Sequence, residues 1–376
     1  MTHSREGGRS VGPVVIWGAG AMGGSIGAWL HRAGVEVLFV DADRAHVAAI
    51  RERGLRITGP VDEFTVRAQA VTPEELAAGV PAGVVQTGVA VEEEPRGTPG
   101  RPGPAWPPPP FHVVLLAVKA HHTRTAVEAL APHLAEDGCV VSVQNGLNER
   151  VIAEVVGESR TMGCFVNFGA DVMEPGVVMR GNRGAVVVGE LDGAVTPRVQ
   201  GIHELLRVFE PDAVLTDNIH GFLWGKLAYG ALLFATALTD ASIADVLAST
   251  RHRPVLVEMG REVVRATLAR GIRPEPFNGF DPRAFHPDAS DQVAHASLDE
   301  LVAFNRGSAK SHSGVWRDLA VRKRKTEVDA QIAPIAELAA ATGVDTPLVR
   351  RLVELVHDVE EGRRAQGWET LDALGE

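Results

Sequence analysis

A glycine-rich turn near the start of the chain constrains its fold more than any other feature. Residues 14–17 form a short apolar run, followed at once by Gly18-x-Gly20-x-x-Gly23 and a helical pattern. This order is typical of a dinucleotide-binding site: the first glycine allows a tight turn, the second lets a pyrophosphate approach the backbone, and the third lets the helix pack on the strand. N–H groups at the start of the helix then face the phosphates. The residues expected to bind the cofactor here are Gly18, Gly20, Ala21, Met22 and Gly23.

Asp41 ends the second expected strand, residues 35–41, and bears on the choice of cofactor. A carboxylate at this place accepts both ribose hydroxyls of NAD and repels the 2′-phosphate of NADP. Two alternatives stay open. In the first, Asp41 is only a turn residue or a helix cap and has no role in cofactor binding; Asp43 is equally placed to cap the next helix. In the second, the nearby cation Arg44 permits binding of NADP. We expect NAD, with NADP as the alternative.

Strands and helices alternate through the first half of the chain. After the helix expected at 45–53, further strands are expected at 55–57, 64–70, 113–118, 140–143, 161–168 and 185–189. This alternation predicts an α/β fold of the Rossmann type, with a doubly wound parallel sheet in a dinucleotide-binding domain of residues 13–217. Residues 1–12, which are polar and glycine-rich, are expected to form a disordered tail.

From residue 218 onward the pattern predicts helices only. Residues 218–376 are therefore expected to form an all-α domain for substrate binding and dimerisation, with ligands in a cleft between the two domains. The expected helices cover residues 218–238, 240–250, 253–270, 290–305, 315–332, 334–342 and 347–360.

A proline-rich segment, residues 92–110, interrupts the first domain. Neither a helix nor a central strand can run through it, because proline lacks the N–H that both require. We expect an exposed insertion. Its run of four prolines is also compatible with a polyproline ligand for another protein.

Composition excludes several classes of function. The 376 residues have a formal net charge of −11, so no basic surface is available for nucleic acid or an anionic membrane. The longest apolar stretch, 227–238, falls short of the ~20 residues that span a bilayer. Cys139 and Cys164 are too few for a thiolate metal site, and they suit a reducing compartment. We expect a cytoplasmic protein without metal, whose partner is a small molecule.

Four further segments carry a family resemblance. They are LLAVK at 115–119, VQNGLN at 143–148, WGKL at 224–227 and RKRKTEVD at 322–329. In this order and spacing, together with the glycine motif, they resemble the ketopantoate reductase (2-dehydropantoate 2-reductase) family over nearly the whole chain outside the tail and the insertion. The resemblance implies hydride transfer between a nicotinamide and a carbonyl or alcohol carbon.

The resemblance also implies roles for single residues. Lys226 matches the general acid or base, Glu327 its partner and a substrate-hydroxyl contact, Asn145 a catalytic and cofactor contact, and Lys119 a lysine near the cofactor. The chemistry agrees, because an ammonium group stabilises the negative charge that develops on a carbonyl oxygen during hydride transfer. The simpler interpretations are a border lysine for Lys226, a solvated helix face for Glu327 and a turn residue for Asn145.

The sequence departs from the family pattern in the expected substrate site. Members that reduce ketopantoate carry asparagines one and two helical turns after the catalytic lysine, where this chain has Gly230 and Phe234. The paired serines of the family appear as Ser313-Gly314, and His312 offers a replacement polar group. We expect Gly230, Phe234, His312 and Ser313 to contact the substrate.

Two alternatives follow. The first is an NAD-dependent dehydrogenase of a bulkier or less polar hydroxy acid or alcohol, which Gly230 and Phe234 favour. The second, from a different class, is a dinucleotide-binding regulator without catalysis. The long apolar helices of the second domain further suggest a homodimer.

Overall fold

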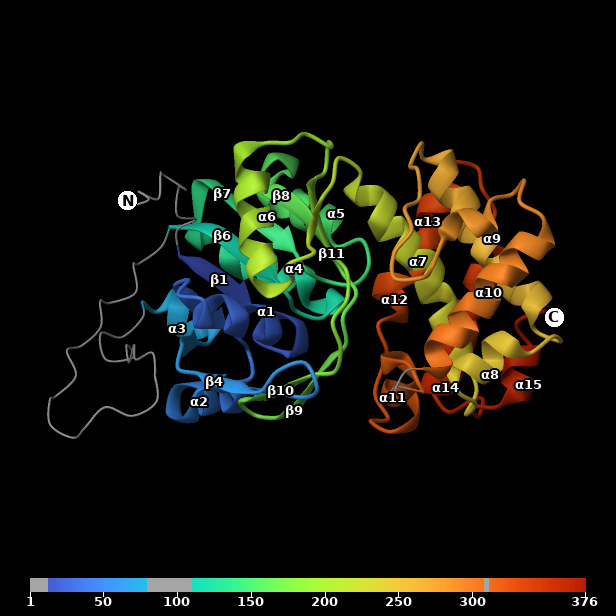
Figure 1. Ribbon diagram of the computed structural model, residues 1–376, viewed down its shortest axis with the longest axis horizontal. Helices are drawn as coiled ribbons and strands as arrows, with labels where there is room; N and C mark the ends of the chain where they lie inside the picture. The colour runs from blue at the N-terminus through green and yellow to red at the C-terminus, as the bar shows by residue number, and fades with distance from the viewer. Residues whose placement is uncertain (1–12, 80–109, 308–310) are drawn as a thin grey trace, which may run out of the picture. The chain divides into compact units, whose positions relative to one another are not determined.

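The computed structural model describes residues 13–79, 110–307 and 311–376, which form two compact units (Figure 1). The first unit contains the described residues up to Gln144 together with Asn148–Ile219, and the second contains Asn145–Leu147 and His220–Glu376. The expected tail, residues 1–12, and the expected insertion except for Pro110 lie outside the described residues.

An eight-stranded sheet forms the centre of the first unit. Every neighbouring pair is parallel except β11 and β8, which confirms the predicted doubly wound α/β fold apart from one antiparallel pair. In sheet order, the strands are β12 (Val214–Leu215), β11 (Val186–Glu190), β8 (Thr161–Val166), β7 (Leu134–Ser142), β6 (Phe111–Leu116), β1 (Val14–Trp17), β2 (Val37–Val40) and β5 (Gln69–Val71).

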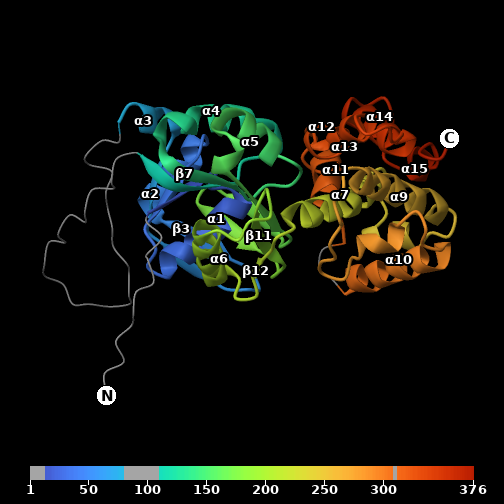
Figure 2. The same cartoon turned by 90° about the horizontal axis from the view of Figure 1, so that it is seen from above.

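Helices cover both faces of this sheet (Figure 2). Alternate residues of β1 point to opposite faces, as the pleat requires. Val14 and Ile16 share a core with α1 (Ala21–Arg32) and α6 (Pro197–Phe209). Val15 and Trp17 share the other core with α4 (Thr123–Leu130) and α5 (Glu149–Val156). Two more helices, α2 (Arg44–Arg53) and α3 (Pro73–Ala77), complete the α-helices described in this unit.

A second, four-stranded sheet was not predicted. Its order is β4 (Phe64–Val66), β3 (Leu55–Thr58), β10 (Val177–Arg180) and β9 (Ala170–Glu174). The single strand expected at 64–70 is wrong, because residues 64–66 pair with β3 whereas residues 69–71 pair with β2. Strands β9 and β10 form a hairpin that turns at Gly176, where φ is +81°.

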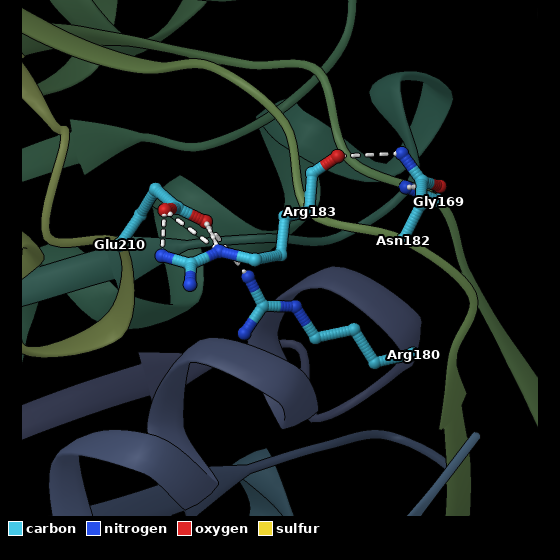
Figure 3. A network of polar contacts seen from close by, with 5 residues as sticks. All are labelled: Gly169, Arg180, Asn182, Arg183 and Glu210. Carbon is cyan, nitrogen blue, oxygen red and sulfur yellow. Dashed lines mark hydrogen bonds and ion pairs between the residues drawn. The ribbon is translucent and has the colours of Figure 1, made fainter. Parts of the chain in front are cut away.

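A buried arginine joins this second sheet to the helices α1 and α6 (Figure 3). The side chain of Arg180 is 2% exposed and donates to Glu210 Oε2 at 3.0 Å. Its guanidinium group lies 4.6 Å from the ring centre of Trp29 and 4.0 Å from that of Phe209. Burial lowers the pKa of Arg180 to about 10, and Glu210 also accepts from Arg183. Cation–π contacts and the paired carboxylate therefore hold this charge inside the first unit.

The second unit is helical, as predicted. The expected helix over 315–332 is wrong as a single element, because residues 321–327 interrupt it. Lys323 has φ +50° there, and Arg322 and Arg324 both pair with Asp318, so the basic run is not one helix face. The α-helices described in the second unit are α7 (Ile219–Thr236), α8 (Ile243–Ala248), α9 (Arg253–Ala269), α10 (Asp291–Arg306), α11 (Gly314–Ala320), α12 (Val328–Gln331), α13 (Ala333–Ala340), α14 (Pro347–Glu360) and α15 (Trp368–Asp372).

Within the described ranges, no helix combines the length and the apolar character that crossing a membrane requires.

Candidate active site

The three motif glycines have the geometry that their predicted roles require. Gly18 turns with φ +102°, and a Cβ atom there would lie 2.7 Å from the backbone nitrogen of Val118. A Cβ on Gly23 would lie 2.0 Å from the carbonyl oxygen of Gly18, so only glycine lets α1 approach β1 this closely. A Cβ on Gly20 would meet no other described part of the chain within 4 Å, which leaves space over the backbone.

The N-terminus of α1 suits a phosphate group. Gly20 is its N-cap and supplies no side chain to bond the first N–H groups. The first N–H groups of any helix have no partner within the helix, and together with the helix dipole they favour an anion. The residues present therefore fit the pyrophosphate of a dinucleotide, with Ala21, Met22 and Gly23 forming the first turn.

Asp41 holds the glycine turn from the end of β2. Its Oδ2 accepts from the N–H of Ala19 at 2.7 Å, and its Oδ1 accepts from the N–H of Asp43 at 2.9 Å. Asp43 caps α2, as the sequence suggested, by accepting from the N–H groups of Ala45 and His46. Each carboxylate oxygen of Asp41 keeps a second lone pair, so these bonds are compatible with additional bonds to ribose hydroxyls.

His46 is a residue that sequence reasoning missed. It is 3% exposed, its Nε2 lies 2.9 Å from the carbonyl oxygen of Ala19, and its Nδ1 accepts from the N–H of Gly176 at 3.1 Å. Since Nδ1 accepts, Nε2 carries the proton and donates to Ala19. His46 thus ties the glycine turn to the β9–β10 hairpin. A histidine within a polar helix gave no signal of this role.

The glycine turn lies where the sheet changes direction. β1 pairs with β2 on one side and with β6 on the other, so the strand order reverses next to it. The N–H of Ala117 donates to Trp17 O at 2.8 Å, which brings the end of β6 beside the turn. Lys119 follows two residues later, is exposed, and precedes the short helix η1 (Ala120–His122). Crevices at such switch points are the usual ligand sites of doubly wound sheets.

Lys226 and Asn145 lie together in the second unit. The Nζ atom of Lys226, in the middle of α7, donates to Asn145 Oδ1 at 2.7 Å. Asn145 belongs to the three-residue segment Asn145–Leu147 that packs with the helices, and the next residue, Gly146, turns with φ +98°. Two residues 81 positions apart, both expected to be catalytic, are therefore in direct contact.

Glu327 is the N-cap of α12, and residues on either side of it contact α14. The N–H and hydroxyl groups of Thr326 both donate to Glu360, at 2.6 and 2.7 Å, and Asp329 Oδ1 lies 2.8 Å from Nε2 of His357. The end of α12 lies beside α7, because a Cβ on Gly230 would be 3.9 Å from Cδ1 of Ile332. The segment that carries Glu327 is thus placed next to the helix that carries Lys226.

The four residues expected to contact the substrate have different surroundings. Gly230 lies one turn after Lys226, and of the described side chains only Ile332 would lie within 4 Å of a Cβ added there, whereas the Phe234 side chain is buried. The ring of His312 packs at a tilt against that of Trp316, with 4.0 Å between ring centres. Its Nε2 lies 3.2 Å from Asp240 O, beyond the end of α7.

Ser313 caps α11 by accepting from the N–H of Trp316 at 3.1 Å. At the helical rise of ~1.5 Å per residue, the C-terminal end of α7 is about 15 Å from Lys226. His312 therefore lies near the C-terminal end of α7, whereas Lys226 is in the middle of that helix.

Two family descriptions match the chain. "Ketopantoate reductase PanE/ApbA" matches residues 14–193, and "Ketopantoate reductase PanE/ApbA C terminal" matches residues 218–360. The chain belongs to the ketopantoate reductase family. It is therefore an oxidoreductase that uses a nicotinamide dinucleotide, and this membership does not favour the alternative of a regulator without catalysis.

Curated relatives and solved structures agree with this assignment. The 2-dehydropantoate 2-reductases of Archaeoglobus fulgidus and Pyrococcus abyssi are 27% and 26% identical, each over 93% of this chain and 98% and 99% of their own length. The PanE/ApbA family ketopantoate reductase of Ralstonia eutropha JMP134 has the same fold, with a TM-score of 0.71 at 23% identity, over 93% of this chain and 99% of its own. A D-mandelate dehydrogenase with NADH and anilino(oxo)acetate has a TM-score of 0.72 at 22% identity, over 93% and 98%.

Proposed function

We propose that this chain interconverts a small 2-oxo acid and the corresponding 2-hydroxy acid, with Lys226 as the general acid or base. The observation that carries the proposal is the 2.7 Å hydrogen bond from Lys226 Nζ to Asn145 Oδ1, which holds an amine beside a residue of the VQNGLN segment. The relatives named 2-dehydropantoate 2-reductase support ketopantoate as the first substrate to test.

The roles of the chain's own residues follow from their chemistry. A bound nicotinamide supplies or accepts the hydride. The ammonium group of Lys226 stabilises the negative charge on the substrate oxygen and donates a proton to it, or in the oxidative direction takes the proton as neutral amine. Asn145 accepts one N–H of Lys226 and so restricts its orientation. Glu327 is proposed as a partner for the substrate hydroxyl.

We infer NAD as the cofactor. Gly18, Gly20 and Gly23 with the first turn of α1 are proposed to bind the pyrophosphate, Asp41 the ribose, and Lys119 the cofactor near the end of β6. The carboxylate of Asp41 supports NAD, because a 2′-phosphate placed against it would be repelled.

A bulkier or less polar substrate is the second candidate. Gly230 leaves space one turn after Lys226, and Phe234 supplies an apolar ring where an amide would bind polar groups. The fold is not restricted to ketopantoate, since one structure that shares it is a D-mandelate dehydrogenase with NADH and anilino(oxo)acetate.

The organisation of the whole protein is also inferred. We propose residues 13–217 as the cofactor domain and 218–376 as the substrate and dimerisation domain of a cytoplasmic homodimer. Val293 and Phe304 of α10 are apolar and about half exposed, which supports the dimer. Cys139 and Cys164 are free thiols, which supports a cytoplasmic location. Light scattering of the purified protein at several concentrations tests the dimer, and a constant monomer mass would contradict it.

One set of assays tests the reaction. NADH and NADPH are each combined with ketopantoate and with larger 2-oxo acids. For the reverse reaction, NAD and NADP are each combined with the corresponding hydroxy acids. The absorbance of the reduced nicotinamide is followed in every assay. Lys226→Ala should lower kcat about 10²- to 10⁴-fold, and added small primary amines should restore part of it. Full activity of Lys226→Ala would exclude the proposed acid–base role.

A further inference from the structure

The peptide unit between residues 19 and 20, inside the glycine turn, is held by a buried histidine. The carbonyl oxygen of Ala19 lies 2.9 Å from Nε2 of His46. Nδ1 of the same ring accepts from the N–H of Gly176, so Nε2 carries the proton and donates to Ala19 O. Because His46 is only 3% exposed, water has little access to replace this donor. The imidazole ring therefore determines where the carbonyl group of Ala19 points.

Asp41 and His46 act on two consecutive peptide units. Asp41 accepts from the N–H of Ala19 at 2.7 Å and so holds the unit between residues 18 and 19. His46 holds the next unit, between residues 19 and 20. The two units are joined by rotatable bonds at Ala19, and Gly20 resists rotation of the second unit little because it has no Cβ atom. Asp41 alone thus does not fix the second unit, and its orientation depends on His46.

The orientation of this second unit matters for an anion. A peptide unit is planar and almost always trans, so the N–H of Gly20 points away from the carbonyl oxygen of Ala19 and from His46. Gly20 is the N-cap of α1, and its N–H is one of the four that have no partner within the helix. If the unit rotated by half a turn, a carbonyl oxygen would replace this N–H and would repel a phosphate. The bond from His46 opposes that rotation.

The group on the other side of the imidazole ring is firmly placed. Gly176 lies at the turn of the β9–β10 hairpin, and its carbonyl oxygen accepts from the N–H of Arg56 in β3 at 2.9 Å. A Cβ on Gly176 would lie 2.9 Å from Cβ of Ala49, so the hairpin turn packs closely on α2. All of these groups belong to the first unit. His46 therefore connects a fixed backbone N–H to the rotatable peptide unit of the glycine turn.

We propose that His46 is a positioning residue for cofactor binding: by donating from Nε2 to Ala19 O, it keeps the N–H of Gly20, rather than a carbonyl oxygen, directed at the pyrophosphate. Gly176 supports this role because its N–H fixes the tautomer of the ring. The inference rests on the proposed role of the glycine turn as the pyrophosphate site. It predicts that cofactor affinity depends on a donor at the place of Nε2, and not on the stability of the first unit.

Two substitutions separate the two hydrogen bonds of His46. Glutamine places its amide nitrogen as far from the backbone as Nε2, so His46→Gln keeps a donor for Ala19 O. Asparagine places its amide oxygen near the position of Nδ1, so His46→Asn keeps only an acceptor for the N–H of Gly176. Since each variant loses one buried hydrogen bond, the two should have similar melting temperatures. His46→Ala loses both bonds, and Glu52→Gln, on the exposed face of α2, is the matched control.

Binding of NADH and of ADP-ribose, which has the pyrophosphate but no nicotinamide, is measured by calorimetry on full-length proteins that are folded by circular dichroism. His46→Gln and the control should keep Kd within about threefold of wild type, whereas His46→Asn and His46→Ala should raise Kd at least about tenfold for both ligands. At saturating NADH all variants should keep kcat within about threefold, with KM for NADH following Kd. Equal Kd values for His46→Gln and His46→Asn would overturn the inference.

Nitrogen-15 NMR of the imidazole in wild type gives a readout that does not depend on any variant folding. The His46 signals, assigned by their loss in His46→Gln, should show a protonated Nε2 and an unprotonated Nδ1, and the opposite tautomer would contradict the proposal. Gly20→Ala tests the site on which the inference rests. Unchanged NADH binding in Gly20→Ala would remove the pyrophosphate site from the glycine turn. Weaker binding in Gly20→Ala with unchanged binding in His46→Asn would remove only the role of His46.

Discussion

The carboxylate of Asp41 accepts a hydrogen bond from the N–H of Ala19, 2.7 Å away, and so couples the end of β2 to the glycine turn. The residue proposed to select the ribose therefore also holds the turn that is proposed to bind the pyrophosphate. Asp41→Ala should weaken NADH binding about tenfold or more, because a charge-assisted hydrogen bond contributes about 1.5–3 kcal/mol. The ratio of NADPH to NADH affinity should rise, since the repelling charge is gone. Titration of nicotinamide fluorescence measures both, and an unchanged ratio would argue against a role at the ribose.

Gly20 and Gly23 should respond differently to the same added methyl group. Gly23→Ala places a Cβ 2.0 Å from Gly18 O, so it should unfold or markedly destabilise the first unit. Gly20→Ala meets no described neighbour within 4 Å and should fold normally, but its methyl should obstruct a bound pyrophosphate and raise the Kd for the cofactor at least about tenfold. Thermal melts with and without cofactor separate the two effects. Equal melting temperatures for both variants would contradict the packing argument.

Gly230→Asn tests the proposed substrate site. Among the described residues, the one neighbour of a Cβ added there is Ile332 at 3.9 Å, so the side chain has room, and any residue other than proline improves on glycine inside a helix by up to about 1 kcal/mol. We expect kcat/KM for ketopantoate to rise and that for larger, less polar 2-oxo acids to fall. Gly230→Ala is the control, because it adds helix propensity without an amide. The same preference in both variants would show that the amide is not recognised.

Glu360→Gln should weaken the support of Glu327. The carboxylate of Glu360 accepts from both the N–H and the hydroxyl group of Thr326, the residue before Glu327. A neutral amide oxygen is a weaker acceptor, and the expected result is a loss of about three- to tenfold in kcat/KM with a small change in melting temperature. Exposed Glu361→Gln, at the end of the same helix, serves as the control. A loss of stability without any loss of kcat/KM would assign Glu360 to folding alone.

Stability should depend on pH through Glu149. Its pKa in the folded protein is raised to about 7, whereas an exposed glutamate has a pKa near ~4.3. The folded state then binds more protons than the unfolded state between these values, so the free energy of unfolding should decrease as pH rises from ~4.3 to 7, with a slope near −1.4 kcal/mol per pH unit from this group. Urea unfolding of wild type and Glu149→Gln across this range isolates the contribution. Parallel pH profiles would refute it.

The sequence predicted elements well where one local pattern decides them. The apolar run, three glycines and following helix determined the first β–α unit, and the helices of residues 218–305 followed from their periodicity. Pairing between distant segments was not predictable in this way. Residues 64–66 and 69–71 read as one strand because they are nearly contiguous, yet they pair in different sheets.

For the candidate site, too, the sequence predicted what a motif reveals and missed what depends on contacts between distant segments. Roles for Lys226 and Asn145 were expected only because of a family resemblance. Their direct contact was not predicted, since nothing in either segment reveals its partner. His46 was missed because burial and hydrogen-bond direction depend on the three-dimensional surroundings. A histidine in a short helix has no pattern that separates it from surface residues.

The chain passes between the two units at 144/145, 147/148 and 219/220, because Asn145–Leu147 packs with the helices. The helical unit therefore does not consist of one continuous segment of the chain. A chimaera that exchanged only residues 220–376 for those of another reductase would pair a foreign lysine with the resident asparagine, so engineers who wish to transplant specificity must move the three-residue segment along with it.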